Sequence, residues 1–259
     1  MPVSVFENVE GARLNRTESA GLAGTNGWWN TIEEGDFDND GDMDFVLGNH
    51  GENSRFRATL SKPISMYVND FDSNGKVEQI ISGYNNDESY PIALKHDLVN
   101  QMPHLKKKYL KYESYKFNSV HDIFTAEEMK GSITLEVTNL QSSLLINQGQ
   151  GNFEVKTLPY EVQTTPIYAF VVKDFDNDGY LDLVCGGNLY GVKPEFGRYD
   201  ASFGSFLKGS PQGFKSVSPN ESGLWVEGEI RDLELINGQH LIVAKNNAPL
   251  EILKIDQPK

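Results

Sequence analysis

One pattern of acidic residues occurs three times along the chain and limits its possible folds more than any other feature. Each copy reads D-x-D-x-[DN]-G-x-x-[DE], and the copies begin at Asp36, Asp70 and Asp174. A run of aromatic and β-branched residues precedes each copy, and a short apolar run that ends in glycine follows it. Such runs on both sides of turn residues are typical of strands. The sequence therefore predicts a repeated unit of strand, acidic loop and strand.

The rest of the chain shows further short apolar runs between turn-forming residues. Short strands at even spacing with glycine-rich turns indicate a sandwich, a barrel or a propeller, and an internal repeat selects the propeller. We predict an all-β fold, a β-propeller of four-stranded blades, with about four blades that either close a small ring or form part of a larger propeller. In a closed ring, the first strand would pair with the three at the C-terminal end. The predicted strands are 4–9, 28–32, 64–68, 133–137, 143–147, 153–158, 167–172, 202–207, 214–217, 229–236, 240–244 and 250–255.

The third acidic loop lies much farther from the second than the second lies from the first. Within the intervening segment, Leu94, Leu98 and Met102 recur at helical spacing, and Pro91 and Pro103 stand at suitable helix starts. We predict a helical insertion near 91–130 inside a single propeller domain over 1–259. The insertion carries a basic patch, which is either a solvated helix face or a contact for a partner or polyanion. The lysines of this patch are Lys106, Lys107, Lys108, Lys111 and Lys116.

The acidic loops have the composition of calcium sites. Carboxylates so close together repel one another unless a cation neutralises them. Ca²⁺ takes 6–8 oxygen ligands, and zinc and copper favour nitrogen and sulfur. Glycine at position 6 turns the chain around the ion, and the carbonyl at position 7 can add a ligand. The alternative is a set of Asx-rich turns without an ion. We predict up to three Ca²⁺ ions, with the ligands Asp36, Asp38, Asp40, Asp42, Asp44, Asp70, Asp72, Asn74, Lys76, Glu78, Asp174, Asp176, Asp178, Tyr180 and Asp182.

An EF-hand loop begins in the same way, and the sequence excludes it. An EF-hand requires a bidentate glutamate at position 12 and helices on both sides. Position 12 is Leu47, Ile81 or Cys185 in the three loops, and the flanking runs are strand-like.

Charge and composition exclude several other classes. The chain has 23 Lys and Arg against 37 Asp and Glu, a formal net charge of −14, which argues against nucleic-acid binding. No apolar stretch is long enough to predict a transmembrane segment. The N-terminal residues lack the pattern of a signal peptide, so the protein is either cytosolic or begins at a processed boundary. The single cysteine, Cys185, excludes an internal disulfide and a cysteine-based zinc site, and we expect it to be a small buried hydrophobe.

The sequence offers few candidates for other chemistry. It contains neither G-x-S-x-G nor H-E-x-x-H. Trp28 and Trp29 could stack on a sugar, but neighbours on a strand face opposite sides, which places at least one in the core. Arg198 and Asp200 could form a polar ligand site on a loop, or an internal ion pair.

With these motifs in hand, the sequence resembles the FG-GAP/VCBS repeat family of calcium-binding β-propellers. More specifically, it looks like the bacterial VCBS-repeat proteins associated with ASPIC/UnbV domains, relatives of cartilage acidic protein. The resemblance covers nearly the whole chain and implies four-stranded blades, calcium in the first interstrand loops, and export from the cytosol. It implies no reaction. The matching segments are 27–30, 35–41, 48–49 with 53–54, 69–72, 90–91, 105–108, 197–202, and 222–223 ahead of Gly228.

Two functions of different classes follow from these observations. The first is a non-catalytic calcium-binding propeller that acts as an extracellular, periplasmic or cell-surface module for adhesion or binding of a protein or glycan. Further propeller blades or a self-association partner would then cover its open edges. The second is a carbohydrate-active hydrolase or lyase on the same scaffold. It requires carboxylates that are not metal ligands, and a cleft lined by Glu195, Arg198 and Asp200 would favour it.

Overall fold

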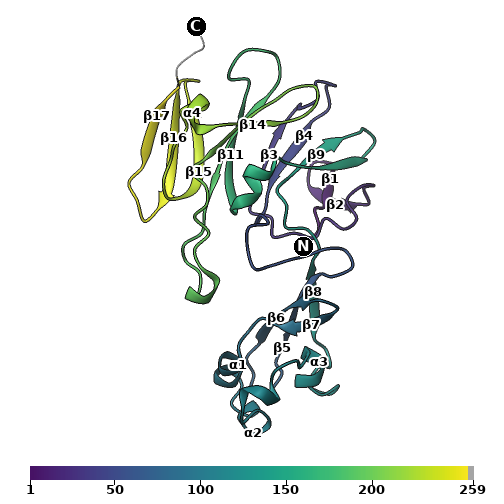
Figure 1. The fold of residues 1–259 in the computed structure, drawn as a ribbon. Helices are drawn as coiled ribbons and strands as arrows, with labels where there is room; N and C mark the ends of the chain where they lie inside the picture. Colours follow the sequence, from purple (N-terminus) through teal and green to yellow (C-terminus); the bar gives the residue numbers. More distant parts are fainter. Residues whose placement is uncertain (256–259) are drawn as a thin grey trace. The chain divides into compact units, whose positions relative to one another are not determined.

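A computed structural model describes residues 1–255 and is built mainly from β-strands (Figure 1). The strands form five sheets, and every strand pair within them is antiparallel. The chain divides into two compact units, which we call unit 1 (Met1 with Phe56–Asn139) and unit 2 (Pro2–Arg55 with Leu140–Lys259). No helix among the described residues is both long and apolar enough to cross a membrane.

Unit 2 contains three larger sheets and one hairpin. The larger sheets have the strand orders β10-β9-β4-β3, β11-β12-β13-β14 and β15-β16-β17, and the hairpin is β1-β2. The strands are β1 (Val5–Val9), β2 (Arg13–Thr17), β3 (Thr31–Gly35), β4 (Asp44–Gly48), β9 (Ser143–Asn147), β10 (Phe153–Thr157), β11 (Ile167–Lys173), β12 (Asp182–Gly187), β13 (Ser205–Lys208), β14 (Lys215–Val217), β15 (Glu229–Ile236), β16 (His240–Asn246) and β17 (Glu251–Lys254).

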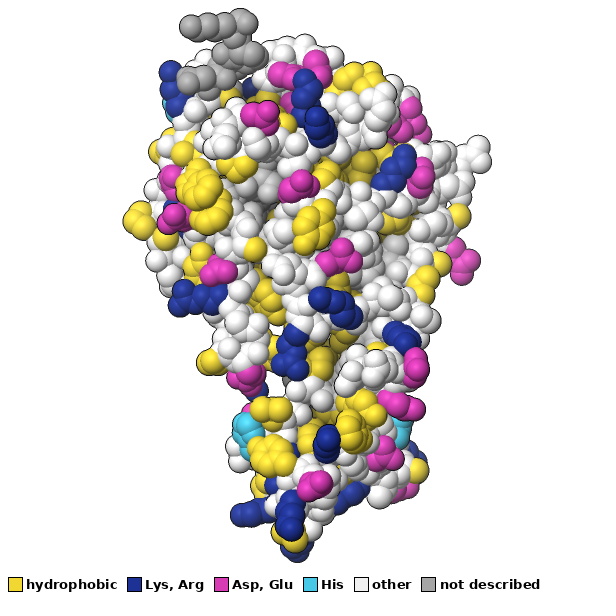
Figure 2. Space-filling view, viewed as in Figure 1, with side chains coloured by type: hydrophobic (Ala, Val, Ile, Leu, Met, Phe, Trp, Pro, Cys, Tyr) yellow, Lys and Arg dark blue, Asp and Glu magenta, His cyan; other side chains and the backbone are white. Residues whose placement is uncertain are grey.

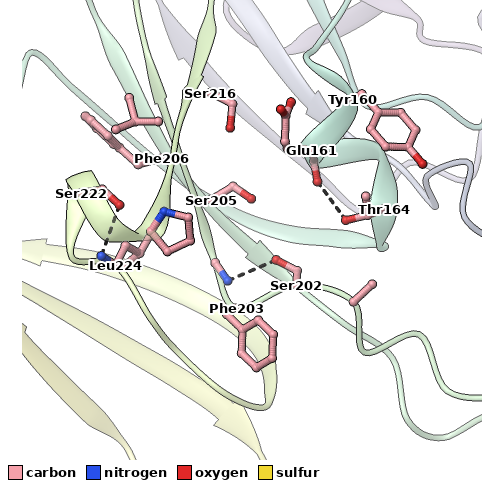
Figure 3. A pocket seen from close by; sticks show the side chains of 14 residues that line it. Tyr160, Glu161, Thr164, Ser202, Phe203, Ser205, Phe206, Ser216, Ser222 and Leu224 are labelled. Atoms are coloured by element: carbon pink, nitrogen blue, oxygen red, sulfur yellow. Dashed lines mark hydrogen bonds between the residues drawn. The ribbon is translucent and has the colours of Figure 1, made fainter.

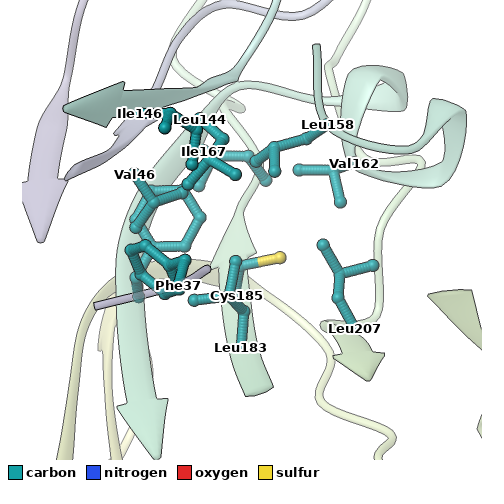
Figure 4. Close-up of a cluster of buried hydrophobic side chains, with 11 residues drawn as sticks. Phe37, Val46, Leu144, Ile146, Leu158, Val162, Ile167, Leu183, Cys185 and Leu207 are labelled. Atoms are coloured by element: carbon teal, nitrogen blue, oxygen red, sulfur yellow. The ribbon is translucent and has the colours of Figure 1, made fainter. Parts of the chain in front are cut away.

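The first strands of the three larger sheets are neighbours in unit 2. Strand β11 lies against β3 on one side and against β15 on the other. Apolar side chains from β4, β9, β11, β12 and β13 fill the space between the first two sheets, and Figure 4 shows this cluster. Cys185 is part of it and is 1% exposed, which confirms the prediction of a small buried hydrophobe. Burial raises the pKa of its thiol to about 12, so the group stays protonated and inert.

Unit 1 is one four-stranded sheet covered by short helices. Its strand order is β7-β6-β5-β8. Leu98, Met102 and Leu105 from the helical segment pack with Phe71 and Ile80 of the sheet side, so the predicted helical spacing marks a real apolar face. The elements are β5 (Ile64–Asn69), β6 (Glu78–Asn85), β7 (Glu88–Pro91), α1 (Lys95–Gln101), α2 (Leu105–Lys108), η1 (Tyr112–Ser114), α3 (Val120–Ile123) and β8 (Ile133–Val137); unit 2 also has η2 (Tyr160–Thr164), η3 (Pro194–Phe196) and α4 (Pro219–Ser222).

The basic patch of the helical segment is partly structural. Figure 2 shows Lys and Arg side chains gathered at the end of unit 1 where α2 lies. Lys108 Nζ donates hydrogen bonds to the carbonyls of Asp122 and Ile123, at 2.6 and 2.9 Å, and so satisfies acceptors at the end of α3.

The ring closure, one of the two alternatives that the sequence left open, is not seen among residues 1–255. Strand β1 pairs with β2, whereas the C-terminal sheet contains only β15, β16 and β17. The cause is local: three residues, 10–12, join β1 to β2, and two of them, Glu10 and Gly11, have the positive φ angles of a tight hairpin turn, 56° and 74°. This turn brings Arg13–Thr17 back beside β1 as its nearest partner.

Candidate metal centres

Each acidic loop joins two hydrogen-bonded strands of one sheet. Loop one (36–44) connects β3 to β4, loop two (70–78) connects β5 to β6, and loop three (174–182) connects β11 to β12. The predicted unit of strand, acidic loop and strand is therefore confirmed in all three places. Loops one and three belong to unit 2, and loop two belongs to unit 1.

The three loops share one hydrogen-bonded frame. In each, the first aspartate accepts one hydrogen bond from the backbone N–H of position 5 and a second from that of position 6. This side chain thereby holds the loop in a closed turn around its own carboxylate. The pairs are Asp36 with Asp40 and Gly41, both at 3.1 Å; Asp70 with Asn74 at 2.9 Å and Gly75 at 2.8 Å; and Asp174 with Asp178 at 3.2 Å and Gly179 at 3.0 Å.

Glycine at position 6 is required by backbone conformation. The φ angles of Gly41, Gly75 and Gly179 are 93°, 84° and 91°, a region that residues with a Cβ rarely adopt. A Cβ added at any of these three positions would meet no atom within 4 Å. The constraint is therefore torsional, and it belongs to the turn that brings the carboxylates together.

The carboxylate at position 9 is buried and anchors the loop to the sheet. Asp44 and Asp182 are both 0% exposed. Each accepts a hydrogen bond at 2.9 Å from the backbone N–H of the phenylalanine at position 2, Phe37 or Phe175. Each also accepts one from the neighbouring strand or its end, from Asn147 at 2.7 Å or Gly209 at 2.8 Å. Glu78 plays the same part in loop two, at 3.1 Å from Phe71.

The electrostatics of these buried carboxylates favour a cation. Burial raises the pKa of Asp44 and of Asp182, and the backbone hydrogen bonds oppose this effect. Neighbouring carboxylates raise the pKa of both further: Asp38 and Asp40 act on Asp44, and the matching pair in loop three acts on Asp182. A divalent ion would offset both the desolvation and the mutual repulsion.

The donor geometry fits Ca²⁺. Three carboxylates in each loop place one oxygen each within 4.8 Å of the others. Two oxygens bound to one Ca²⁺ at about 2.3–2.6 Å can lie up to about 5 Å apart. In loop two, Asp72 Oδ1 is buried and has no hydrogen-bond partner in the described structure, so it lacks the compensation that a cation would supply. The three groups are Asp36, Asp38 and Asp40; Asp70, Asp72 and Glu78; and Asp174, Asp176 and Asp182.

The remaining predicted ligands lie on the same loops, outside these groups. Position 7 donates its backbone N–H to the side chain at position 5 in each loop. Its carbonyl as a further ligand stays a prediction. The donors are Asp42 to Asp40 at 2.8 Å, Lys76 to Asn74 at 2.8 Å and Tyr180 to Asp178 at 3.0 Å.

Loop three differs from the others because a lysine from β13 reaches it. Lys208 Nζ contacts the carboxylate of Asp176 and lies 3.0 Å from Asp178 Oδ2. This pairing lowers the pKa of Asp178 and raises that of Lys208. Nothing in the sequence near the third repeat signalled this contact.

The residues predicted to bind another ligand are only partly brought together. Trp28 lies edge-on to His50, whose ring centroid is 5.1 Å away, and His50 in turn lies 4.9 Å from the ring of Tyr199. Trp29 instead donates its indole N–H to a backbone carbonyl and packs on the apolar cluster beside β4 and β9. Both tryptophans precede β3, which begins at Thr31, so the predicted start of that strand was three residues too early.

Arg198 and Asp200 stand on the two sides of Tyr199 in the loop after β12. The Arg198 guanidinium lies 5.2 Å from the ring centroid of Tyr190, and Asp200 is exposed. The ion pair considered for these two residues is therefore not what positions Arg198.

His50 is expected to make the protein sensitive to acid. Burial lowers its pKa from the ordinary 6.5 to about 4, so the unfolded chain binds the proton at a higher pH than the folded chain does. The contribution of neutral His50 to the free energy of unfolding is fully present above pH 6.5. It is lost as the pH falls toward 4, and the loss is about 2–3 kcal/mol. The variant His50→Phe keeps an aromatic ring and should lose this part of the dependence. Urea unfolding of both proteins at pH 7.5 and 4.5 measures the difference; equal acid losses would contradict the prediction.

A small hollow of unit 2 contains polar groups that the sequence analysis did not single out. Its volume is about 240 Å³, and η2, β13, β14 and α4 contribute to its walls. Figure 3 shows the carboxylate of Glu161 and the hydroxyls of Ser205 and Ser216 around it. Beside it, Phe203 stacks on Trp225 with ring centroids 4.0 Å apart, and Trp225 is 54% exposed. None of these residues belongs to a repeat or a motif, so only the folded chain reveals them.

Comparison with known proteins supplies no further guide. Neither a family model nor a curated protein sequence matches this chain.

Proposed function

We propose that this chain is a non-catalytic calcium-binding module of the FG-GAP/VCBS type, built from propeller blades and stabilised by the ions in its acidic loops. The observation that carries the proposal is the common frame of the three loops, in which the same positions hold the turn and anchor the loop to the sheet. In each loop, three carboxylates also bring one oxygen each close together, at positions 1, 3 and 5 in loop one and at positions 1, 3 and 9 in loops two and three. The adjacency of β3, β11 and β15 supports the propeller, because the innermost strands of propeller blades surround one axis.

The ions would act structurally. In unit 2, Asp36, Asp38 and Asp40 would hold one ion, and Asp174, Asp176 and Asp182 a second. Each ion would neutralise carboxylates between two paired strands and so favour the folded state. Free calcium outside the cytosol is high enough for sites of modest affinity, which fits an extracellular, periplasmic or cell-surface setting.

The direct test is calcium binding to protein stripped with EDTA. Isothermal titration should give three Ca²⁺ per chain, and Mg²⁺ should bind much more weakly because it demands a smaller octahedral shell. Asp38→Ala should reduce the count to two, because Asp38 is an exposed member of loop one and its loss leaves the fold intact. Absence of calcium binding, or an equal response to Mg²⁺, would refute the proposal.

We propose a glycan as the ligand of the module, bound at the hollow beside Trp225. An exposed indole offers a flat apolar face of the kind on which sugar rings stack, and nearby hydroxyls and a carboxylate can hydrogen-bond sugar hydroxyls. Among the residues that line the hollow, Glu161 is the one carboxylate. Glycoside hydrolysis generally uses two, so this site favours binding over the alternative of a carbohydrate-active hydrolase.

An immobilised glycan panel tests this part of the proposal. Trp225→Ala should lose at least tenfold in affinity for any glycan that the wild type retains. The control Tyr84→Ala removes an exposed aromatic ring from unit 1, away from the hollow of unit 2, and should bind the glycan with the affinity of the wild type. Equal binding by both variants would place the ligand elsewhere, and release of cut glycan by the wild type would favour the enzyme.

A further inference from the structure

Loop three already contains a cation that belongs to the protein itself. Lys208 Nζ lies between positions 3 and 5 of the loop, in contact with Asp176 and 3.0 Å from Asp178 Oδ2. We propose that Lys208 is a tethered counter-ion that Ca²⁺ must displace, so that loop three binds calcium more weakly than loop one and stays ordered without it. This inference rests on the proposed calcium function.

The fold fixes Lys208 at this position. Gly209, the next residue, donates its backbone N–H to Asp182 at 2.8 Å, and Leu207 pairs with Leu183 of β12. The end of β13 is thus held beside the buried carboxylate of loop three. The long side chain of Lys208 then spans the distance to the other carboxylates while its stem stays on the sheet.

Loop one provides a matched comparison without this lysine. There Asn147 donates to Asp44 as Gly209 donates to Asp182, and Leu145 pairs with Phe45 as Leu207 pairs with Leu183. The residue equivalent to Lys208 is therefore Ile146, which is 2% exposed and packs in the apolar core. The two loops share their frame and differ in charge at two places: loop three gains Lys208 from β13, and its position 7 is Tyr180 where loop one has Asp42. Removal of Lys208 alone therefore isolates its effect.

The charge has opposite effects in the two states of the loop. Without calcium, the ammonium group reduces the repulsion among the carboxylates of loop three. When calcium binds, the ammonium group a few ångströms away repels it. Lys208 and Ca²⁺ also compete for the same carboxylate oxygens of Asp176 and Asp178. From Coulomb's law in a solvent-like medium, we expect a difference in affinity of about tenfold.

Site-resolved NMR of ¹⁵N-glycine-labelled protein tests the proposal. The amides of Gly41 and Gly179 each donate to the first aspartate of their own loop and so report on it separately. In the wild type, Gly179 should respond at about tenfold higher Ca²⁺ than Gly41. In Lys208→Met, its midpoint should fall by about tenfold while that of Gly41 stays unchanged. The control Lys215→Met removes an equal charge from the residue that pairs with Lys208 across β13 and β14, and should move neither midpoint more than about twofold.

The outcomes separate this inference from the proposed function. A response of Gly41 with an unchanged Gly179 midpoint in Lys208→Met would overturn the inference alone. Silence of both glycines would overturn both proposals. Urea unfolding adds a second readout: Lys208→Met should unfold at lower urea than the wild type in EDTA but not in millimolar Ca²⁺. Equal destabilisation in both conditions would identify an ordinary salt bridge and refute the counter-ion role.

Discussion

Removal of calcium is expected to lower the free energy of unfolding of unit 2 by about 5 kcal/mol. Unit 2 contains loops one and three, and each site contributes about 2.7 kcal/mol when calcium is at a hundredfold excess over the Kd of the weaker one. For a unit of this size, the loss corresponds to a fall in Tm of about 10–20 °C. Unit 1 contains loop two alone, so its loss should be about half as large.

Hydrogen exchange separates the two units in this experiment. Peptides from β11 and β15 report on unit 2, and peptides from β5 and β6 report on unit 1. In EDTA, exchange in β11 should accelerate more than exchange in β5. The control is Mg²⁺ at the same concentration, which should restore little protection. If both units were as well protected in EDTA as in calcium, the acidic loops would be turns that hold their shape without an ion.

Strands that contain a clear run of apolar residues were predicted correctly from the sequence. The predicted runs 133–137, 143–147 and 229–236 match β8, β9 and β15 in their bounds. Strands β2 and β7 were missed because Arg13–Thr17 and Glu88–Pro91 contain few apolar residues. Both are placed by a tight turn that forces the chain back on its neighbour, and such turns are a weaker signal than an apolar run.

Partners distant in sequence could not be predicted in the same way. Strand β4 pairs with β9, and in the sequence the whole segment 56–139 of unit 1 separates them. Neither strand carries a local pattern that identifies the other as its partner. A local pattern fixes which face of a strand is buried, but pairing across a long insertion depends on the whole core. The division into two compact units likewise depends on contacts between segments that are distant in the sequence.

The candidate site was predictable to the extent that its ligands are local. Four acidic or amide positions within nine residues identify the loops, since the spacing itself brings the side chains together. Lys208 and Asn147 act on these loops from other strands, and only the sheet register places them there. The contacts that distinguish one loop from another therefore come from tertiary structure.

Asp44→Ala is expected to destabilise calcium-loaded unit 2 by about 3–5 kcal/mol. Asp44 is 0% exposed, and its removal leaves the backbone N–H groups of Phe37 and Asn147 without their acceptor. Each buried donor without a partner costs about 1–3 kcal/mol. The loss should be smaller in EDTA, because the substitution also removes a buried charge that the neighbouring carboxylates repel.

The matched control for this prediction is Asp38→Ala, in the same loop. Asp38 is exposed, and its one backbone hydrogen bond, from Asp40, is long at 3.3 Å. In EDTA this variant should lose less than about 1 kcal/mol, while in calcium it should lose the contribution of one ion. Urea unfolding of both variants with and without calcium gives the four values. If Asp44→Ala proved no more harmful than Asp38→Ala in EDTA, the buried carboxylate would not anchor the loop to the sheet, and its role would be confined to the ion.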